Sequence, residues 1–201
     1  MAGGPTADMV ALESETDALD PGDRAPEFEL RGTDGGTYSL SDFDSYDALL
    51  VVFTCNHCPY AQAKFDAMND IADAYESVAV VGINPNDADE YPEDSLEKMV
   101  EYVEAGEIDV TAYLRDESQT VAEAYGAVCT PDPFLFRNDD DDNDTFRLAY
   151  HGRFDDALNP GEEPSGAPGF EMRDAIENVL AGEEPADEFR PSRGCSIKWQ
   201  E

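Results

Sequence analysis

The sequence predicts an α/β fold with a central mixed β-sheet flanked by helices, and three observations support this. Two continuous apolar runs, residues 48–54 and 78–83, are typical of strands that are buried on both faces. Each run is followed by a segment whose apolar residues recur at helical spacing. Two more strand candidates, residues 134–136 and 146–150, precede a final helix near residues 171–181. Strands that alternate with helices in this way form a sheet covered by helices.

Turn and capping signals predict the remaining elements. Residues 21–42 alternate apolar and polar positions around a Gly-Gly pair, which predicts an N-terminal β-hairpin. One amphipathic helix is expected to follow the run 48–54 and to end at about Tyr75. Asp94 and Glu97 match a capping box, so an inserted helix is expected to begin there and to lead into a strand near residues 110–114.

The length of 201 residues fits one domain with short extensions. Residues 1–20 are expected to be a disordered lead-in, and residues 21–182 are expected to form the domain. Residues 183–201 are expected to be a tail that packs on that domain, because this tail is unusually basic for such an acidic protein. The acidic stretch 138–144 is expected to be a solvated hairpin turn.

The charge of the chain is its most unusual property. It has 47 Asp and Glu residues against 12 Lys and Arg, which gives a formal net charge of -35. Phosphate backbones would be repelled, so no nucleic-acid partner is expected. An acidic surface of this kind stays soluble in concentrated salt, where charges are screened, and it indicates the cytoplasm of a halophile. No apolar run is long enough for a membrane helix and the N-terminus does not resemble a secretory signal, so a cytoplasmic protein without a membrane partner is expected.

Cys55 and Cys58 lie where a buried strand is predicted to give way to a helix. Unpaired N–H groups and the positive end of the helix dipole stabilise a thiolate at such a position. His57 lies between the two cysteines and would lower a thiol pKa further. Pro59 fits the first turn, where a missing N–H does least harm. A CxxC pair in this setting predicts a redox-active dithiol, with Cys55 as the attacking thiolate and Cys58 as the resolving thiol.

Two other interpretations of the cysteines remain open at this stage. The pair could be structural, although two core cysteines do not require a strand-to-helix turn. The pair could also bind zinc with two of His57, Cys129 and Cys195, although the chain lacks a second CxxC. The redox interpretation is preferred, and no metal ligands are assigned.

Three motifs give the chain a resemblance to a known family. Residues 53–59, Phe-Thr-Cys-Asn-His-Cys-Pro, resemble the active-site turn of the thioredoxin superfamily. Residues 128–136, Val-Cys-Thr-Pro-Asp-Pro-Phe-Leu-Phe, resemble its cis-proline loop and the strand that follows. The N-terminal hairpin, the inserted helix and residues 193–199 are similar to the peroxiredoxin-like, AhpC/TSA-related redoxins. The resemblance covers about residues 21–199 and implies a thioredoxin-like fold.

The resemblance also implies roles for further residues. It implies that Pro131 is cis and faces the dithiol, and that the backbone of Thr130 is offered to an extended substrate. Thr54, the residue before the first cysteine, departs from thioredoxin, which has a tryptophan there, and it is expected to support the site. Cys129 would lie close to the dithiol and is either an additional redox thiol or a small buried side chain. Cys195, in the basic tail, is a second possible redox thiol, and the tail could bring it near Cys129.

The expected activity is therefore thiol–disulfide exchange without a cofactor. The partners would be a protein or low-molecular-weight thiol or disulfide as substrate, and a thiol as electron donor. A thiol-dependent peroxidase of the peroxiredoxin type is the first alternative. A metal-binding chaperone on the same fold is the second.

Overall fold

The computed structural model describes residues 10–139 and 146–201. Its main sheet has seven strands in the order β3-β2-β6-β5-β4-β8-β9, in which the central β4, β5 and β6 are parallel. The outer strands run antiparallel to their neighbours, so the sheet is mixed, as predicted. Its strands are β2 (Glu29–Gly32), β3 (Thr37–Ser39), β4 (Ala48–Phe53), β5 (Val78–Asn84), β6 (Ala112–Arg115), β8 (Asp132–Asn138) and β9 (Phe146–His151).

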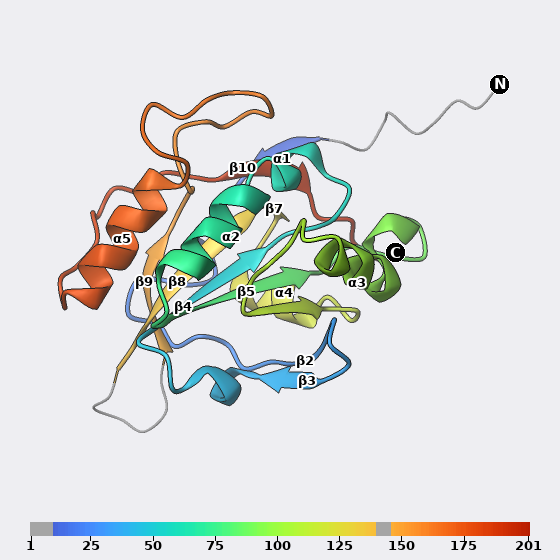
Figure 1. Cartoon of the computed structure of the whole chain (residues 1–201), viewed down its shortest axis with the longest axis horizontal. Coiled ribbons are helices and arrows are strands. Elements are labelled where there is room, and N and C mark those ends of the chain that lie inside the picture. Colours follow the sequence, from blue (N-terminus) through green and yellow to red (C-terminus); the bar gives the residue numbers. More distant parts are fainter. Residues whose placement is uncertain (1–9, 140–145) are drawn as a thin grey trace.

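Helices cover the sheet, and Figure 1 shows α2 and α5 side by side on the face turned to the viewer. The strands β2 and β3 form the predicted N-terminal hairpin at the opposite end of the sheet from β9. The α-helices of the described residues are α1 (Pro59–Gln62), α2 (Phe65–Ala74), α3 (Leu96–Glu104), α4 (Thr120–Tyr125) and α5 (Phe170–Leu180), and two short 3-10 helices span Leu40–Phe43 and Pro92–Asp94.

Strand β4 is the centre of the molecule because both of its faces are buried. Leu49, Val51 and Phe53 pack into a cluster with the hairpin, α4 and β8. The alternate residues Leu50 and Val52 pack on the other face against α2 and α5. Successive side chains of a strand point to opposite faces, so this continuous apolar run fills two cores at once. The end of β4, where the first cysteine follows, is thereby held in place from both sides.

A second, three-stranded sheet joins the two ends of the chain, in the order β1-β10-β7. Its strands are β1 (Ala11–Glu13), β7 (Cys129–Thr130) and β10 (Arg193–Ser196). The tail therefore packs on the domain through β10. The prediction of a disordered lead-in is wrong for β1, because its backbone pairs with β10, a partner that is distant in sequence. Residues 1–9 lie outside the described residues.

Two other elements differ from their predictions. The helix expected up to Tyr75 is interrupted at Ala63 and Lys64, where the chain leaves α1 and starts again as α2. Lys64 reaches away to Asp155 at 2.5 Å and to the carbonyl oxygen of Ala157 at 2.9 Å. Helix α3 takes Ser95 as its N-cap, since the Ser95 hydroxyl accepts the backbone N–H of Lys98. The predicted acidic turn falls mostly outside the described residues.

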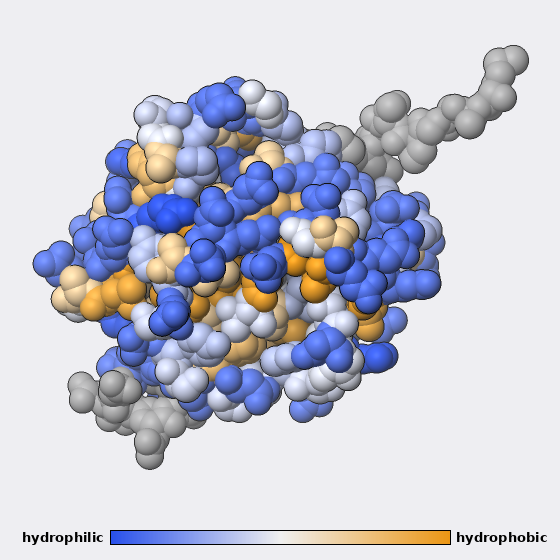
Figure 2. Space-filling model, in the orientation of Figure 1, coloured by the Kyte–Doolittle hydropathy of each residue, from blue (hydrophilic) through white to orange (hydrophobic). Residues whose placement is uncertain are grey.

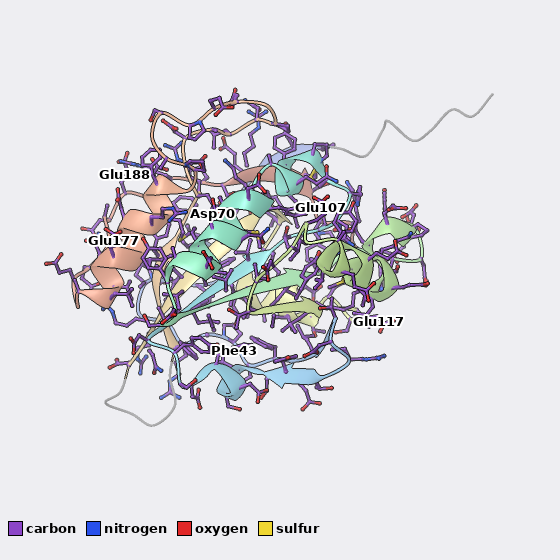
Figure 3. The ribbon with its side chains drawn as sticks, in the orientation of Figure 1. Phe43, Asp70, Glu107, Glu117, Glu177 and Glu188 are labelled. Atoms are coloured by element: carbon purple, nitrogen blue, oxygen red, sulfur yellow. A yellow bond between two sulfur atoms is a disulfide. The ribbon has the colours of Figure 1, made fainter. Side chains whose placement is uncertain are left out.

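Hydrophilic residues predominate on the face shown in Figure 2, with hydrophobic residues exposed between them across its middle. Exposed acidic side chains come from helices and loops alike, as the labelled Asp70, Glu107, Glu117, Glu177 and Glu188 show in Figure 3. Within the described parts of the chain, no helix is both long and apolar enough to span a membrane.

We expect the thermal stability to rise with salt, because a net charge of -35 is self-repulsive and salt screens it. The Debye length falls to about 3 Å at 1 M salt. Melting followed by circular dichroism in 0.1 M and 2 M KCl measures the effect. A midpoint that stays constant or falls in 2 M KCl would contradict the halophilic interpretation.

Candidate active site

The two cysteines follow β4 as the sequence predicts, but their relation to the helix differs from the prediction. Cys55 lies in the loop before the helix, and Cys58 is the N-cap of α1. Pro59 occupies the first position of α1, where its missing N–H leaves no intrahelical bond unmade. Because α1 has only four residues, the helix dipole available at this turn is small.

The cis-proline loop packs directly against both sulfurs. The Thr130–Pro131 peptide bond is cis, as the resemblance implied. The Sγ of Cys55 lies 3.3 Å from the Thr130 hydroxyl oxygen. The Sγ of Cys58 lies 3.7 Å from the Thr130 carbonyl oxygen. Thr130 therefore touches both members of the predicted dithiol.

Cys58 forms a disulfide, and its partner is Cys195 in β10, 137 residues further along the chain. Cys55 and Cys129 are free and buried. The sequence led us to expect a bond between Cys55 and Cys58, and the suggested neighbour of Cys195 was Cys129. In the structure Cys195 lies across from Thr130 in the β10–β7 pairing, and this register brings its sulfur to Cys58.

The thiol of Cys55 is fully buried, and burial raises its pKa to about 12. The negative charge of Asp94 contributes to this raised pKa. Hydrogen bonds from the Thr130 hydroxyl and the Cys58 backbone, and the positive charge of Lys198, act in the opposite direction. In the state with the Cys58–Cys195 bond, the pKa of Cys55 is thus raised, where the sequence predicted it to be lowered.

Asp94 is an important residue of the site that sequence analysis assigned to a helix cap. Its fully buried carboxylate accepts hydrogen bonds from the backbone N–H of Asn56 at 2.7 Å and from the side-chain amides of Asn84 at 3.2 Å and Asn86 at 2.8 Å. Burial opposes its ionisation, but the hydrogen bonds with His57, Asn86 and Asn56 outweigh burial and lower the pKa of Asp94. Asp94 therefore anchors the loop between the two cysteines as a buried carboxylate.

His57 is turned toward Asp94. Its Nδ1 lies 2.5 Å from the carboxylate of Asp94, and its ring stacks on Tyr91 with ring centroids 5.5 Å apart. Lys198 of the tail lies over the same tyrosine ring, with its Nζ 5.7 Å from the ring centroid. His57 thus connects the cysteine loop to the segment before α3. The tail places the ammonium group of Lys198 over the Tyr91 ring of that segment.

Two further predicted site residues, Thr54 and Cys129, make contacts that support the fold. The backbone N–H of Thr54 donates to the Ile83 carbonyl oxygen at 2.9 Å and carries the β4–β5 pairing to the residue before Cys55. The cluster that packs Cys55, Cys58 and Cys195 together does not include Cys129. Burial, with the nearby charge of Asp132, raises the pKa of Cys129. These surroundings favour the interpretation of Cys129 as a small buried side chain over that of an additional redox thiol.

A second buried acid–histidine pair lies just beyond the cis-proline and was not found from the sequence. The Nε2 of His151 lies 2.7 Å from the carboxylate of Asp132, and its ring stacks on Phe134 with the ring centroids 3.9 Å apart. Burial raises the pKa of Asp132, although His151 acts to lower it. The sequence carries no local signal for this pair, because Asp132 and His151 meet only through the pairing of β8 with β9, in which Phe134 is opposite His151.

Cys55, His57 and Asp94 are also the residues of the described chain that could hold a metal ion. One ligand atom from each lies within 4.8 Å of the others, and a thiolate, an imidazole and a carboxylate are ligands that zinc accepts. In the structure, however, His57 and Asp94 are bonded to each other and Asp94 is saturated by amides. A metal ion would have to replace these hydrogen bonds.

The central mixed sheet, the helix after β4 and the cis-proline that faces a cysteine pair define a redox protein of the thioredoxin fold. Residues 21–143 match the model of the AhpC/TSA family. The chain belongs to the AhpC/TSA family.

Several solved structures share the fold of this chain. A hypothetical protein from Sinorhizobium meliloti is 39% identical, with a TM-score of 0.84 over 94% of this chain and 98% of that one. A candidate thiol:disulfide interchange protein, DsbE, from Chlorobium tepidum is 20% identical, with a TM-score of 0.58 over 82% and 97% of the two chains. Peroxidoxin BcpB from Mycobacterium tuberculosis is 18% identical, with a TM-score of 0.57 over 82% and 97%. The last two similarities show the fold alone. None of the curated proteins matches the chain.

We expect Asp94→Asn to destabilise the protein and to lower the pKa of Cys55. The amide cannot accept all the hydrogen bonds that the carboxylate accepts, and each buried donor left unpaired costs about 1–3 kcal/mol. In a protein of this size, 1 kcal/mol corresponds to a shift of roughly 2–4 °C in melting temperature. The pKa of Cys55 should fall because the charge that helps to raise it is removed.

Thermal melting and thiolate absorbance near 240 nm, followed against pH in the oxidised protein, measure the two effects. Glu97→Gln, in the first turn of α3, is the control, since Glu97 was expected to share the cap with Asp94. Equal melting temperatures for both variants and wild type would contradict the role assigned to Asp94.

Proposed function

We propose that the chain is a thiol–disulfide oxidoreductase whose working dithiol is Cys55 and Cys58. The observation that carries this proposal is the contact of both sulfurs with Thr130, beside the cis-Pro131 bond. Membership of the AhpC/TSA family supports redox chemistry in general. The substrate would be a disulfide or thiol of a protein or a small molecule, with a thiol as electron donor and without an organic cofactor.

The reaction follows from the two sulfurs. Cys55, as a thiolate, attacks one sulfur of a substrate disulfide, and the other substrate sulfur leaves as a thiol after taking a proton. Cys58 then attacks the Sγ of Cys55, which forms the Cys55–Cys58 bond and releases the second substrate thiol. Two electrons pass to the substrate, and a donor dithiol or two donor thiols then reduce the Cys55–Cys58 bond and restore the dithiol. The reverse sequence oxidises a substrate dithiol.

This cycle requires Cys58 to be a thiol, so the Cys58–Cys195 bond must open before it starts. The described state is therefore an oxidised form of the enzyme. In this state Cys55 and Cys58 are completely buried, and Cys195 is 2% exposed. A buried thiol with a raised pKa reacts poorly with peroxide in this state. Cys55 is therefore expected to react only after the Cys58–Cys195 bond has opened. We accordingly prefer disulfide exchange to the peroxidase alternative.

We expect Cys55→Ser and Cys58→Ser each to lower disulfide reductase turnover by roughly a thousand-fold or more, as expected when a nucleophile is removed. Turnover is measured in 2 M KCl with dithiothreitol as donor and insulin as disulfide substrate. Cys129→Ala is the matched control, because it removes a free buried cysteine outside the cluster that packs Cys55 and Cys58, and it should keep the wild-type rate.

Hydrogen peroxide and metal content separate the alternatives. Peroxide consumption faster than insulin reduction by the wild-type protein would favour a peroxidase. Stoichiometric zinc or copper in the purified protein, lost in Cys55→Ser, would favour a metal-binding protein. Full insulin reduction by Cys55→Ser would contradict the dithiol mechanism itself.

A further inference from the structure

The C-terminal strand lies on the edge of the cis-proline loop. In the β10–β7 pairing, Cys195 is opposite Thr130 and Ser196 is opposite Cys129. The hydroxyl of Ser192 donates to the Pro131 carbonyl oxygen at 2.7 Å. The extended chain of the tail therefore occupies the backbone edge beside the two active-site sulfurs.

Glycine at position 194 allows this close approach. A Cβ atom at Gly194 would collide with the carbonyl group of Thr130 and would lie 2.9 Å from the backbone nitrogen of Pro131. Without that atom, β10 lies flat against the loop, and the neighbouring Cys195 reaches Cys58. An extended substrate would need the same geometry to present a sulfur to this site.

Contacts on both sides hold the tail in this position. On its other edge β10 pairs with β1, where Ala11 is opposite Cys195. Beyond β10, the backbone N–H of Lys198 donates to the Asn86 side-chain oxygen at 2.9 Å, and Asn86 itself binds Asp94. The Lys198 carbonyl oxygen accepts the Gln119 amide at 2.7 Å. The tail is thus joined to the same hydrogen-bond network that anchors the cysteine loop.

We propose that Cys195 is the third cysteine of the redox centre and that Cys58 is the shared sulfur, which bonds either to Cys55 or to Cys195. This inference rests on the proposed function. Cys195 serves as an internal thiol that takes over the disulfide from Cys55 after a substrate has been reduced. The strand that carries it then covers the loop edge that an extended substrate requires.

The exchange step conserves atoms and electrons. The thiolate of Cys195 attacks the Sγ of Cys58 in the Cys55–Cys58 disulfide. The Cys58–Cys195 bond forms, the Cys55–Cys58 bond breaks, and Cys55 leaves as a thiolate. Cys55 takes up the one proton that Cys195 has lost, so the protein is neither oxidised nor reduced. Reduction of the Cys58–Cys195 bond by a donor dithiol then supplies two electrons and two protons and reopens the site.

The direction of this exchange agrees with the surroundings of Cys55. Cys55 is completely buried beside the hydroxyl of Thr130 and near the carboxylate of Asp94, where a neutral thiol is favoured over a thiolate. The product of the exchange therefore contains a stable Cys55 thiol and a covalently attached tail.

Disulfide mapping tests the shared sulfur. Wild-type protein, Cys195→Ser, Cys55→Ser and the control Cys129→Ala are oxidised, acid-quenched, alkylated and digested for mass spectrometry. We expect Cys58–Cys195 as the major bond in wild type, Cys129→Ala and Cys55→Ser, and Cys55–Cys58 in Cys195→Ser. A Cys195→Ser protein that forms no Cys55–Cys58 bond would overturn the proposal.

Rapid quenching during turnover distinguishes a redox bond from a permanent structural bond. Oxidised wild type is mixed with dithiothreitol and insulin, and the Cys58–Cys195 bond is quantified over time. We expect it to open at least as fast as insulin is reduced. Turnover with this bond intact would overturn the role of Cys195 together with the Cys55–Cys58 cycle, which needs Cys58 as a thiol. A bond that opens and is replaced by Cys55–Cys58 once the donor is exhausted would overturn the role of Cys195 and leave the proposed function standing. Absence of insulin reduction by wild type, even with the bond opened, would overturn the proposed function.

Gly194→Ala tests the strand contact with every cysteine retained. Its Cβ should displace β10 from Thr130, increase the share of the Cys55–Cys58 bond in the oxidised protein, and speed hydrogen exchange in β10. Gly36→Ala is the control, because a Cβ there would meet only side-chain atoms of Asp34 and Tyr38, far from the site in the hairpin. The same disulfide distribution and exchange rates in Gly194→Ala as in wild type would contradict the contribution of strand docking.

Discussion

The contacts of Thr130 are the constraint on which the redox centre depends. Its hydroxyl meets the Sγ of Cys55, its carbonyl oxygen lies near the Sγ of Cys58, and its backbone pairs with Cys195. These cysteines come from the end of β4 and from the C-terminal tail. A single residue next to the cis-Pro131 bond thus brings together segments that are far apart in the sequence. The buried position of β4 makes this possible, because packing on both faces fixes where the first cysteine emerges.

Salt screens the acidic residues of the surface, but it has little effect on the buried charge inside the site. The exposed acidic residues are spread over the molecule and are screened by salt. Asp94, in contrast, is buried beside Cys55, and salt screens its charge much less. Hydrogen bonds from Asn86 and Asn56 and the contact with His57 lower the pKa of Asp94 in spite of its burial. The same carboxylate therefore shapes the cysteine loop and favours the neutral thiol of Cys55, which makes loop geometry and sulfur reactivity inseparable.

The sequence predicts most of the fold because its signals are local. Apolar runs and turn residues locate the main strands and the hairpin, and the two motifs around Cys55 and Pro131 identify the family. Long-range partners are not local signals: nothing near Cys195 shows that it bonds Cys58, and nothing near Ala11 shows that it pairs with the tail. Asp94 and Glu97 match the capping-box pattern, so the sequence predicts a cap at Asp94, whereas the structure places it one residue later at Ser95. Only the burial of Asp94 in three dimensions reveals the hydrogen bonds that it accepts.

A redox titration with counting of thiols tests the central claim that these cysteines form a reversible redox centre. The protein is equilibrated in 2 M KCl with dithiothreitol buffers of increasing potential, quenched, and the free thiols are counted by alkylation and mass spectrometry. The account predicts a single reversible change of two thiols per chain, carried by Cys58 and one partner. Its midpoint should lie above about -300 mV, whereas the potentials of structural disulfides typically lie below that value. A thiol count that does not change above that potential would contradict it.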